Sequence, residues 1–334
     1  MNELRRDPIT GRWIIVCLDK IPNLEDLKAL PQEKKDKECP FCLGHERMTP
    51  PEITAHRKLG PSNSSGWTVR VVPNKYPALR IEGELHKEGI GLFDLMNGVG
   101  AHEVIIETSD HFRDIHDLNK LEMEEVIWTY LARSMDLKQD KRLKYILIFK
   151  NYGIAAGASL SHPHSQLISL PIVPKRVKEE LEGATRYFEY RGRCVFCDMI
   201  REETEEGDRI VYQDDKFIAF CPYVSRFPYE IWILPKKHQP DFASTERDAV
   251  PNLARALKTS LIKIKGLLND PPFNFIIHTS PINGYERDDY HWHIEIMPKL
   301  SKVAGFEWGS GFYINPVPPD IAASGLASIK TEES

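Results

Sequence analysis

Two short cysteine motifs are the first residues in this sequence whose spacing indicates chemistry. Residues 39–42 (Cys-Pro-Phe-Cys) and 194–197 (Cys-Val-Phe-Cys) share the C-x-x-C spacing and a phenylalanine before the second cysteine. Such a pair forms either a redox couple or half of a zinc site. A redox pair is expected between a strand and a helix, whereas the first motif follows a charged segment and precedes a glycine-containing turn. A zinc site therefore fits better.

Histidines that recur after each cysteine pair can supply the remaining ligands of two tetrahedral sites. In both halves the pair is followed by an apolar strand that ends near a histidine, and then by a second apolar strand that leads into a His-x-His motif. One histidine of each His-x-His motif can complete a Cys-Cys-His-His site, which leaves the other for different chemistry. These histidines are His111, His162 and His164 in the first half, and His238, His291 and His293 in the second.

The histidine left over in the first half is the candidate for catalysis. A neutral imidazole is a competent nucleophile toward phosphorus when an acceptor holds its second nitrogen. In an extended strand, His162, His164 and Gln166 project from the same face, and Pro163 interrupts the strand or places its exposed start at an edge. The residues before the motif suit a phosphate, because they offer hydroxyl donors and flexible glycines: Ser159, Ser161, Gly153 and Gly157.

The second His-x-His motif has a different environment. It lacks the glycine-rich lead-in and has Glu295 where the first half has Gln166. A carboxylate repels phosphate. We therefore expect one active half and one degenerate half that keeps its metal.

The elements between these motifs predict an α+β protein made of two repeated halves, each a mostly antiparallel sheet with packed helices. The predicted halves are residues 1–178 and 179–334. We expect a charged, partly helical loop at 22–38 and a polar tail at 320–334. Cys17 and Cys221 lie in apolar runs and are expected to be buried, inert thiols. Apolar residues at helical spacing predict two core-facing helices, through Met123, Ile127, Tyr130, Leu131 and Met135 and through Leu253, Leu257, Leu261, Ile264 and Leu268.

Composition excludes several classes of function. The 334 residues are 41% hydrophobic and carry a formal net charge of −5, which argues against a general nucleic-acid binder. No apolar run is long enough to span a bilayer. The charged N-terminal residues lack a secretory signal, so we expect a cytoplasmic protein without membrane or nucleic-acid partners.

Motifs along nearly the whole chain resemble the galactose-1-phosphate uridylyltransferase family, the nucleotidyltransferase branch of the histidine-triad superfamily. The resemblance rests on ordered matches to residues 6–13, 39–42, 71–77, 109–111, 162–166 and 304–316.

The resemblance implies a ping-pong transfer through a nucleotidyl-histidine intermediate. His164 matches the nucleophile, and Gln166 matches the residue that steadies the phosphoryl group. The family pattern also implies a structural first zinc on Cys39, Cys42, His111 and His162, and substrate contacts from Asn74, Asn151 and Ser159. Family members are commonly homodimers that share active-site contacts, so a homodimer is expected here.

The internal repeat extends the metal assignment to a second structural zinc, on Cys194, Cys197, His238 and His291. Some family members use a carboxylate and histidines at this site. His278, His293 and Glu180 therefore compete as ligands. The histidines with no assigned role are His45, His56, His86, His102 and His116.

Two departures from the family pattern bear on the substrate. After the strand at 13–16, many members carry an Arg-x-Lys-Arg-Pro run that contacts substrate phosphate, where this chain has Cys17-Leu-Asp-Lys-Ile-Pro22. The Ser-His-Pro-His-Ser-Gln version of the motif is similar to relatives that act on ADP-glucose with phosphate as acceptor.

The sequence thus favours transfer of UMP from a UDP-hexose to a hexose 1-phosphate such as galactose 1-phosphate. An ADP-sugar phosphorylase or adenylyltransferase is the alternative within the same chemistry. Two other classes remain: a zinc-stabilised binding module without transfer activity, and a hydrolase with water as acceptor.

Overall fold

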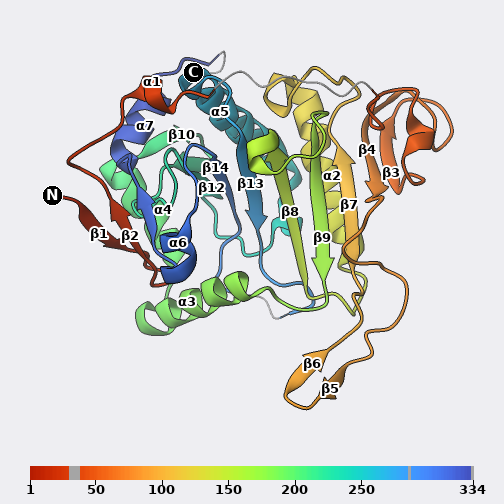
Figure 1. Ribbon diagram of the computed structural model, residues 1–334, viewed down its shortest axis with the longest axis horizontal. Coiled ribbons are helices and arrows are strands. Elements are labelled where there is room, and N and C mark those ends of the chain that lie inside the picture. Colours follow the sequence, from red (N-terminus) through yellow and green to blue (C-terminus); the bar gives the residue numbers. More distant parts are fainter. Residues whose placement is uncertain (30–37, 285–286, 332–334) are drawn as a thin grey trace.

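The computed structural model describes residues 1–29, 38–284 and 287–331. In this part of the chain, ten strands form one central antiparallel sheet (Figure 1). Five strands come from the first half: β3 (Thr54–Arg57), β4 (Trp67–Pro73), β7 (Ala101–Ile106), β8 (Tyr145–Tyr152) and β9 (His164–Leu170). Five come from the second: β10 (Ile210–Gln213), β11 (Phe217–Phe220), β12 (Ile231–Pro235), β13 (Phe273–His278) and β14 (His293–Pro298).

The strand order repeats between the two sets and confirms the expected duplicated α+β fold. From its edge inward, the first set runs β3-β4-β7-β9-β8 and the second runs β10-β11-β12-β14-β13. The sets meet where β8 pairs with β13, from Tyr152 opposite Phe273 to Ile148 opposite Ile277. In each set the His-x-His strand therefore lies between two neighbours. The division at residue 178 stays a prediction.

Two long helices cover one face of this sheet. They are α2 (Lys120–Leu137) and α5 (Val250–Leu268), which pack against each other. Asn119 caps α2: its side chain accepts from the Glu122 N–H at 3.1 Å, and Glu122 accepts in return from the Asn119 N–H at 2.7 Å. The apolar sides of both helices join the main core, as their spacing predicts.

The opposite face of the second half is covered by α3 (Lys175–Arg191), α4 (Val195–Glu206) and an N-terminal layer. In that layer β1 (Glu3–Arg6), β2 (Trp13–Val16) and β15 (Tyr313–Asn315) form a three-stranded sheet. Gly183 lets the N-terminal loop approach α3 closely, because a Cβ there would lie 1.8 Å from the Ile9 carbonyl oxygen. On the first half, most side chains that β8 and β9 present to the same face are half-buried.

The remaining elements are short. A β5–β6 hairpin, in the connection between β4 and β7, projects beyond the strand ends of the first half (Figure 1). These elements are β5 (Glu88–Ile90), β6 (Phe93–Leu95), α1 (Leu24–Leu27), α6 (Gly305–Ser310), α7 (Pro319–Ala327), and 3-10 turns at Glu46–Met48, Ile115–Asp117, Ile154–Ala156, Phe242–Ser244 and Arg247–Ala249.

The expected polar tail at 320–334 is wrong over most of its length. Residues 319–327 form α7, whose apolar side packs against α5 and β10. Its small residues recur at helical spacing, and Pro319 is well placed at a helix start. Residues 332–334, and residues 30–37 of the predicted charged loop, lie outside the described residues.

Two expectations about burial are also wrong. Met135 is 47% exposed although it continues the spacing of the α2 core residues. Steps of four residues rotate by about 40° each around a helix, so the fourth member of such a series leaves the buried face. Cys17 follows the end of β2 and is half-buried, whereas Cys221 is buried as predicted.

Candidate active site and metal sites

The four predicted ligands of the first metal site lie together. Cys39 and Cys42 come from a loop, His111 from a turn after β7, and His162 from the residues that precede β9. Their ligand atoms all lie within 4.8 Å of one another. The Cys42 sulfur is 3.5 Å from Nδ1 of His111 and 3.7 Å from Nδ1 of His162. Zinc bond lengths in tetrahedral geometry place sulfur and nitrogen ligands about 3.6 Å apart, so the four side chains fit a zinc ion.

The second predicted site has the same arrangement. Cys194 caps α4 and Cys197 lies in its first turn, with His238 after β12 and His291 before β14. The Cys197 sulfur is 3.3 Å from Nδ1 of His238 and 3.6 Å from Nδ1 of His291. Histidines at these distances fit a metal site better than a redox pair, although this motif does begin a helix.

The competing ligands form a separate group. Glu180, His278 and His293 lie together, and that group does not include either cysteine. The structure therefore brings together the set that the internal repeat predicts.

The same outer contact orients one histidine in each metal site. Nε2 of His162 lies 2.8 Å from the Thr108 carbonyl oxygen, and Nε2 of His291 lies 2.9 Å from that of Pro235. A carbonyl accepts only from an N–H. The contact therefore places the proton on Nε2 and turns Nδ1 toward the cysteines, which is the usual support of a metal-binding histidine.

His164 begins β9 directly after the first metal site. Its Nδ1 lies 2.8 Å from the carbonyl oxygen of His162 and donates to it. In the neutral imidazole, Nε2 then carries the lone pair. His164 is only 6% exposed, so the expectation of an exposed strand start is wrong. At this start β9 pairs with β7, where His164 lies opposite Ile106, and its pairing with β8 begins at Gln166. Pro163 precedes the strand, where the ladder does not need its missing N–H.

Gln166 points from the same face of β9 and is held by His102, a residue that sequence reasoning left without a role. The Ala78 N–H donates to Nδ1 of His102 at 3.1 Å, which places the proton of a neutral ring on Nε2. That nitrogen is 2.9 Å from Oε1 of Gln166. The contact orients the Gln166 amide, whose NH2 group then faces away as a donor. Nδ2 of Asn74 also lies 3.1 Å from Nε2 of His102, but both atoms are donors in this tautomer, so the contact is not a hydrogen bond.

The other predicted substrate-binding residues surround this strand unequally. Asn151 lies on β8, and its oxygen accepts from Asn274 at 2.8 Å. Ser159 is exposed on the loop before the motif. Ser161 instead contacts the metal site, with its hydroxyl 3.3 Å from Nε2 of His111. In the same loop, Gly153 and Gly157 have φ of 82° and 91°, a conformation that favours glycine.

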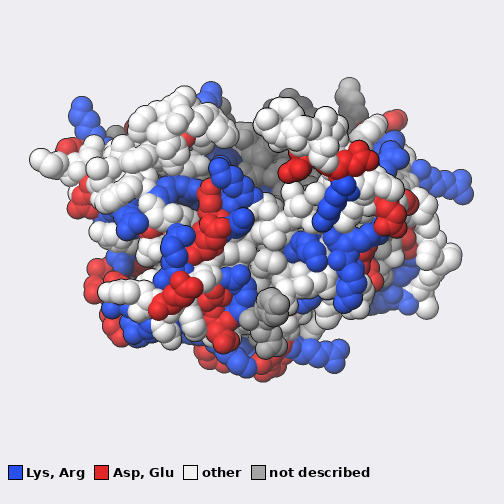
Figure 2. Space-filling view, turned by 90° about the horizontal axis from the view of Figure 1, so that it is seen from below, with Lys and Arg blue, Asp and Glu red and all other residues white. Residues whose placement is uncertain are grey.

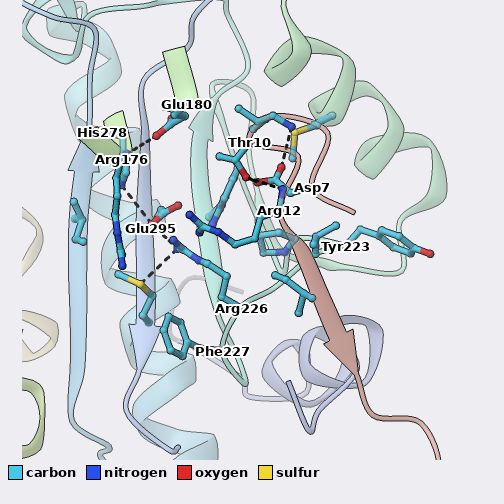
Figure 3. A pocket seen from close by; sticks show the side chains of 18 of the residues that line it. Asp7, Thr10, Arg12, Arg176, Glu180, Tyr223, Arg226, Phe227, His278 and Glu295 are labelled. Carbon is cyan, nitrogen blue, oxygen red and sulfur yellow. Dashed lines mark hydrogen bonds and ion pairs between the residues drawn. The ribbon is translucent and has the colours of Figure 1, made fainter. Parts of the chain in front are cut away.

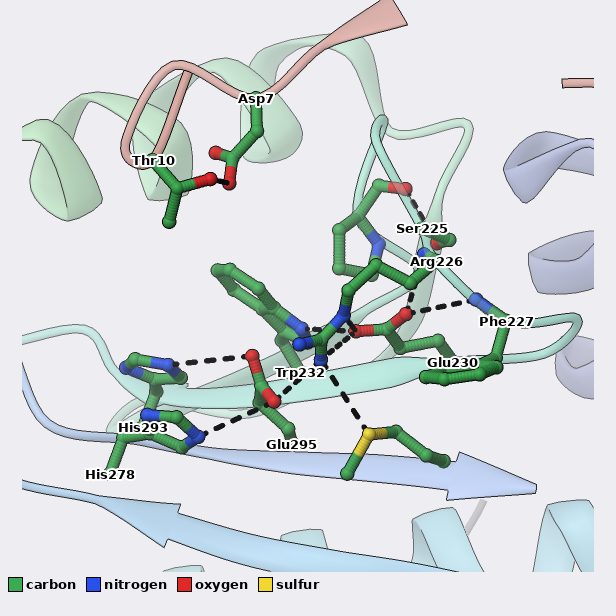
Figure 4. A network of polar contacts seen from close by, with 12 residues as sticks. Asp7, Thr10, Ser225, Arg226, Phe227, Glu230, Trp232, His278, His293 and Glu295 are labelled. Carbon is green, nitrogen blue, oxygen red and sulfur yellow. Dashed lines mark hydrogen bonds and ion pairs between the residues drawn. The ribbon is translucent and has the colours of Figure 1, made fainter. Parts of the chain in front are cut away.

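In the second half, charged residues replace the His102–Gln166 pair. Gln166 lies opposite Val104, and Glu295 lies opposite Trp232 at the equivalent place. His102 precedes Val104 by two residues, and Glu230 precedes Trp232 by two residues, so His102 and Glu230 occupy equivalent places. Arg226 bridges the two carboxylates, at 2.7 Å from Glu230 and 2.6 Å from Glu295 (Figure 4).

These carboxylates are neutralised inside the protein. Burial raises the pKa of Glu295, but the charges of Arg226 and His278 outweigh it and hold the pKa well below its usual range. Burial lowers the pKa of His278, but Glu180 and Glu295 outweigh it and raise the pKa to about 10. The expected degenerate site is thus filled by internal ion pairs.

A cavity of about 1100 Å³ lies on this face of the sheet, between the N-terminal loop, α3 and α4 (Figure 3). Arg12 and Arg176 line it together with Glu295 and His278. Its lining extends to Asn151 on β8 and to Ile168 on β9, next to Gln166, but does not include His164. The cavity therefore adjoins the candidate site rather than forming it.

Charges of both signs are interspersed on the face seen in Figure 2. This mixture agrees with the small net charge of the whole chain. An anionic ligand on such a surface is bound by local donors rather than by a broad basic patch.

Comparison with known proteins decides the family. Residues 1–174 match the model described as galactose-1-phosphate uridyl transferase, N-terminal domain, and residues 180–309 match the C-terminal domain of the same enzyme. The chain belongs to this family. Among the helices that the structure describes, none is both long and apolar enough to cross a membrane.

Similar proteins carry two different names. The chain is 38% identical to an ADP-glucose phosphorylase of Arabidopsis thaliana, over 96% of this chain and 91% of that protein. It is 30% identical to a galactose-1-phosphate uridylyltransferase of Thermotoga maritima, over 99% and 100%. The fold is similar to a crystal structure of an ADP-glucose phosphorylase from Arabidopsis thaliana with bound ADP-glucose, with a TM-score of 0.82, 34% identity and coverage of 99% and 100%.

The two Cys-Cys-His-His groups predict separate, tightly held metal ions. Metal analysis of the purified protein is expected to find about two zinc ions per chain, and about one in a Cys39→Ala/Cys42→Ala variant, because two thiolate ligands are then missing. Cys17→Ala is the control and should keep both ions. Full metal content in the double variant would rule out the first site.

Proposed function

We propose that this protein is a nucleotidyltransferase in which His164 accepts a nucleotidyl group from a nucleoside diphosphate sugar. The observation that carries the proposal is the imidazole of His164, whose Nδ1 is held by the His162 carbonyl beside an amide oriented by His102. Membership of the galactose-1-phosphate uridyl transferase family supports the same chemistry.

The transfer takes place in two displacements. Nε2 of His164 attacks the α-phosphorus, the bond from that phosphorus to the bridging oxygen breaks, and a sugar 1-phosphate leaves with the electron pair. An acceptor oxygen then attacks the same phosphorus and releases Nε2. The phosphoimidazolium formed between the steps is positively charged, and the hydrogen bond from its Nδ1 to the His162 carbonyl stabilises it.

Gln166 is positioned to steady the phosphoryl group. Its oxygen is engaged by His102, so its NH2 group is the part available to phosphate oxygens. Asn74, Asn151 and Ser159 are proposed as further nucleotide and phosphate contacts. The contact of Ser161 with His111 favours a role for that hydroxyl beside the metal rather than at the substrate.

Zinc would be structural at both sites. The four side chains of each site complete its coordination, so no open position is left for substrate. At the first site the ion would fix His162, and through its carbonyl the orientation of His164.

For the substrate, we place ADP-glucose with phosphate as acceptor first. The 38% identity to the Arabidopsis protein named ADP-glucose phosphorylase supports it, as do Ser165 in the His-Pro-His-Ser-Gln motif and the missing Arg-x-Lys-Arg-Pro run. The UDP-hexose and galactose 1-phosphate pair is the second candidate. Its support is the full-length match to the Thermotoga maritima uridylyltransferase.

A label-and-chase experiment tests the function and the substrate together. Incubation with ADP-glucose or UDP-glucose labelled at the α-phosphorus should leave label on wild-type protein and none on His164→Ala. The labelled protein is then given phosphate, galactose 1-phosphate or buffer alone. We expect label from ADP-glucose and its release by phosphate.

Other outcomes of this experiment identify the alternatives. Label from UDP-glucose that is released by galactose 1-phosphate would establish the second candidate. Unlabelled wild-type protein would favour a binding module, and rapid loss of label in buffer alone would favour a hydrolase; either result contradicts the proposal.

His102 should affect the rate more than the binding of nucleotide. In His102→Leu the Gln166 amide is free to rotate, so we expect kcat to fall about 10-fold or more, because an oriented donor to the reacting phosphate is lost. KM should change much less. His56→Leu, on edge strand β3, is the matched control. Unchanged kcat in His102→Leu would contradict the assigned role.

We also propose the homodimer that the family resemblance implies. The segment that contains α6 exposes Phe306 and Trp308, the latter by 73%, and such aromatic surface is typical of an interface. Light scattering should give roughly twice the chain mass of 38.4 kDa, and Trp308→Glu should lower it. A wild-type mass of one chain would contradict the dimer.

A further inference from the structure

A buried polar network lies beneath the start of β9, on the face of the sheet opposite the His164 side chain. The Lys150 ammonium donates to Oε2 of Glu107 at 2.5 Å and to the main-chain carbonyl oxygen of His164 at 3.0 Å. Oε1 of Glu107 accepts from the Tyr130 hydroxyl at 2.9 Å and from the Ser165 hydroxyl. One cation thus connects a core carboxylate to the backbone of the proposed nucleophile.

This network is fully inside the protein. The four side chains are each at most 1% exposed. Burial and the neighbouring Glu107 charge hold the pKa of Tyr130 well above its ordinary value, so its phenol stays protonated and donates. Burying an ion pair is costly, and replacing one with apolar side chains is often neutral or stabilising. Stability alone therefore does not explain the network.

The second half provides an internal comparison. When the register of β8 and β9 is extended by one residue beyond the Phe149–Gln166 pair, Lys150 matches Ser165. The same step beyond the pair of Ile276 and Glu295 reaches Ile277 opposite Ile294. The strand corresponding to β7 ends at Pro235, at the place of Glu107. The half that lacks the proposed nucleophile therefore has apolar residues where the other half has the ion pair.

We infer that Lys150 and Glu107 are positioning residues that fix the backbone of His164 for nucleotidyl transfer. The inference rests on the proposed function of His164.

Contacts on both sides of His164 explain why such support is needed. The Glu107 N–H donates to the Pro163 carbonyl at 3.1 Å, and the His164 carbonyl accepts from Lys150. Pro163 itself has no N–H to give to the sheet. The main chain of Glu107 thus holds the residue before His164, and the Lys150 ammonium, which the Glu107 carboxylate fixes, holds the carbonyl of His164 itself. Small displacements of a reacting group reduce the rate strongly, on the order of 100-fold for 1 Å.

The test replaces the ion pair by apolar residues, as in the second half. In Lys150→Met/Glu107→Leu no unpaired charge remains, and Tyr130 and Ser165 still bond to each other, at 2.7 Å in the native protein. We expect the single-turnover rate of label transfer to His164 to fall about 10- to 100-fold. The concentration dependence of that rate should give a Kd for the nucleotide sugar within about twofold of wild type, since the binding face is untouched.

The control is another buried ion pair on the same face of the same half. Arg133 bonds to both oxygens of Glu103, at 2.6 and 2.7 Å, and this pair joins α2 to β7 without contacting the backbone of β9. Arg133→Met/Glu103→Leu should keep the wild-type transfer rate. If both variants lost rate equally, the loss would reflect a general decrease in stability, and the inference would be overturned.

A second variant decides the matter if the apolar pair does not fold. Lys150→Gln/Glu107→Gln keeps side chains of similar length and a neutral donor near the His164 carbonyl. We expect its transfer rate to lie below that of wild type and above that of the apolar variant. A wild-type rate in either variant would refute the positioning role. Absence of label on wild-type protein would instead refute the proposed function, so the two failures are distinguishable.

Discussion

The structure of the candidate site depends on the hydrogen bond from Nδ1 of His164 to the carbonyl oxygen of His162. This bond determines which ring nitrogen carries the lone pair, because a carbonyl can accept only from the protonated nitrogen. The side chain of His162 meanwhile belongs to the first metal group. His162 thus connects the metal group to the tautomer of His164. A metal ion that takes no part in the chemical steps would still influence them through this connection.

The two halves separate what the fold requires from what the chemistry requires. Both keep a cysteine pair and two histidines, and in both the second histidine of the motif contacts the carbonyl of the first, at 2.8 Å for His164 and 3.2 Å for His293. The metal groups and this contact therefore belong to the repeated architecture. The halves differ beside the motif. The first half has Gln166 and His102, and at the equivalent places the second half has two carboxylates that Arg226 bridges.

The sequence was informative wherever spacing alone determines geometry. Two cysteine pairs, each followed by histidines in the same order, predicted two Cys-Cys-His-His groups, and the family resemblance and the repeat selected the histidine of each His-x-His motif. His102 escaped because its role depends on a partner 64 residues away, and no local pattern marks it. The alternation of β7 could have shown that it shares a face with Val104, which lies opposite Gln166. The exposure of Met135 follows from the rotation of successive four-residue steps around a helix, and the spacing of small residues after Pro319 marks α7, so both features could have been predicted from the sequence.

The charge of the protein also limits how it can hold an anionic substrate. A chain with a net charge of −5 does not attract phosphate by its overall field. The second half shows what carboxylates require at this place on the sheet: Glu230 and Glu295 need the guanidinium of Arg226 between them, which fills the space with protein charge. At the corresponding place the first half has neutral groups, an imidazole and an amide, which need no internal counter-ion. A phosphoryl group can accept hydrogen bonds there without meeting a carboxylate. The proposed chemistry therefore requires that the side chains beside His164 carry no negative charge.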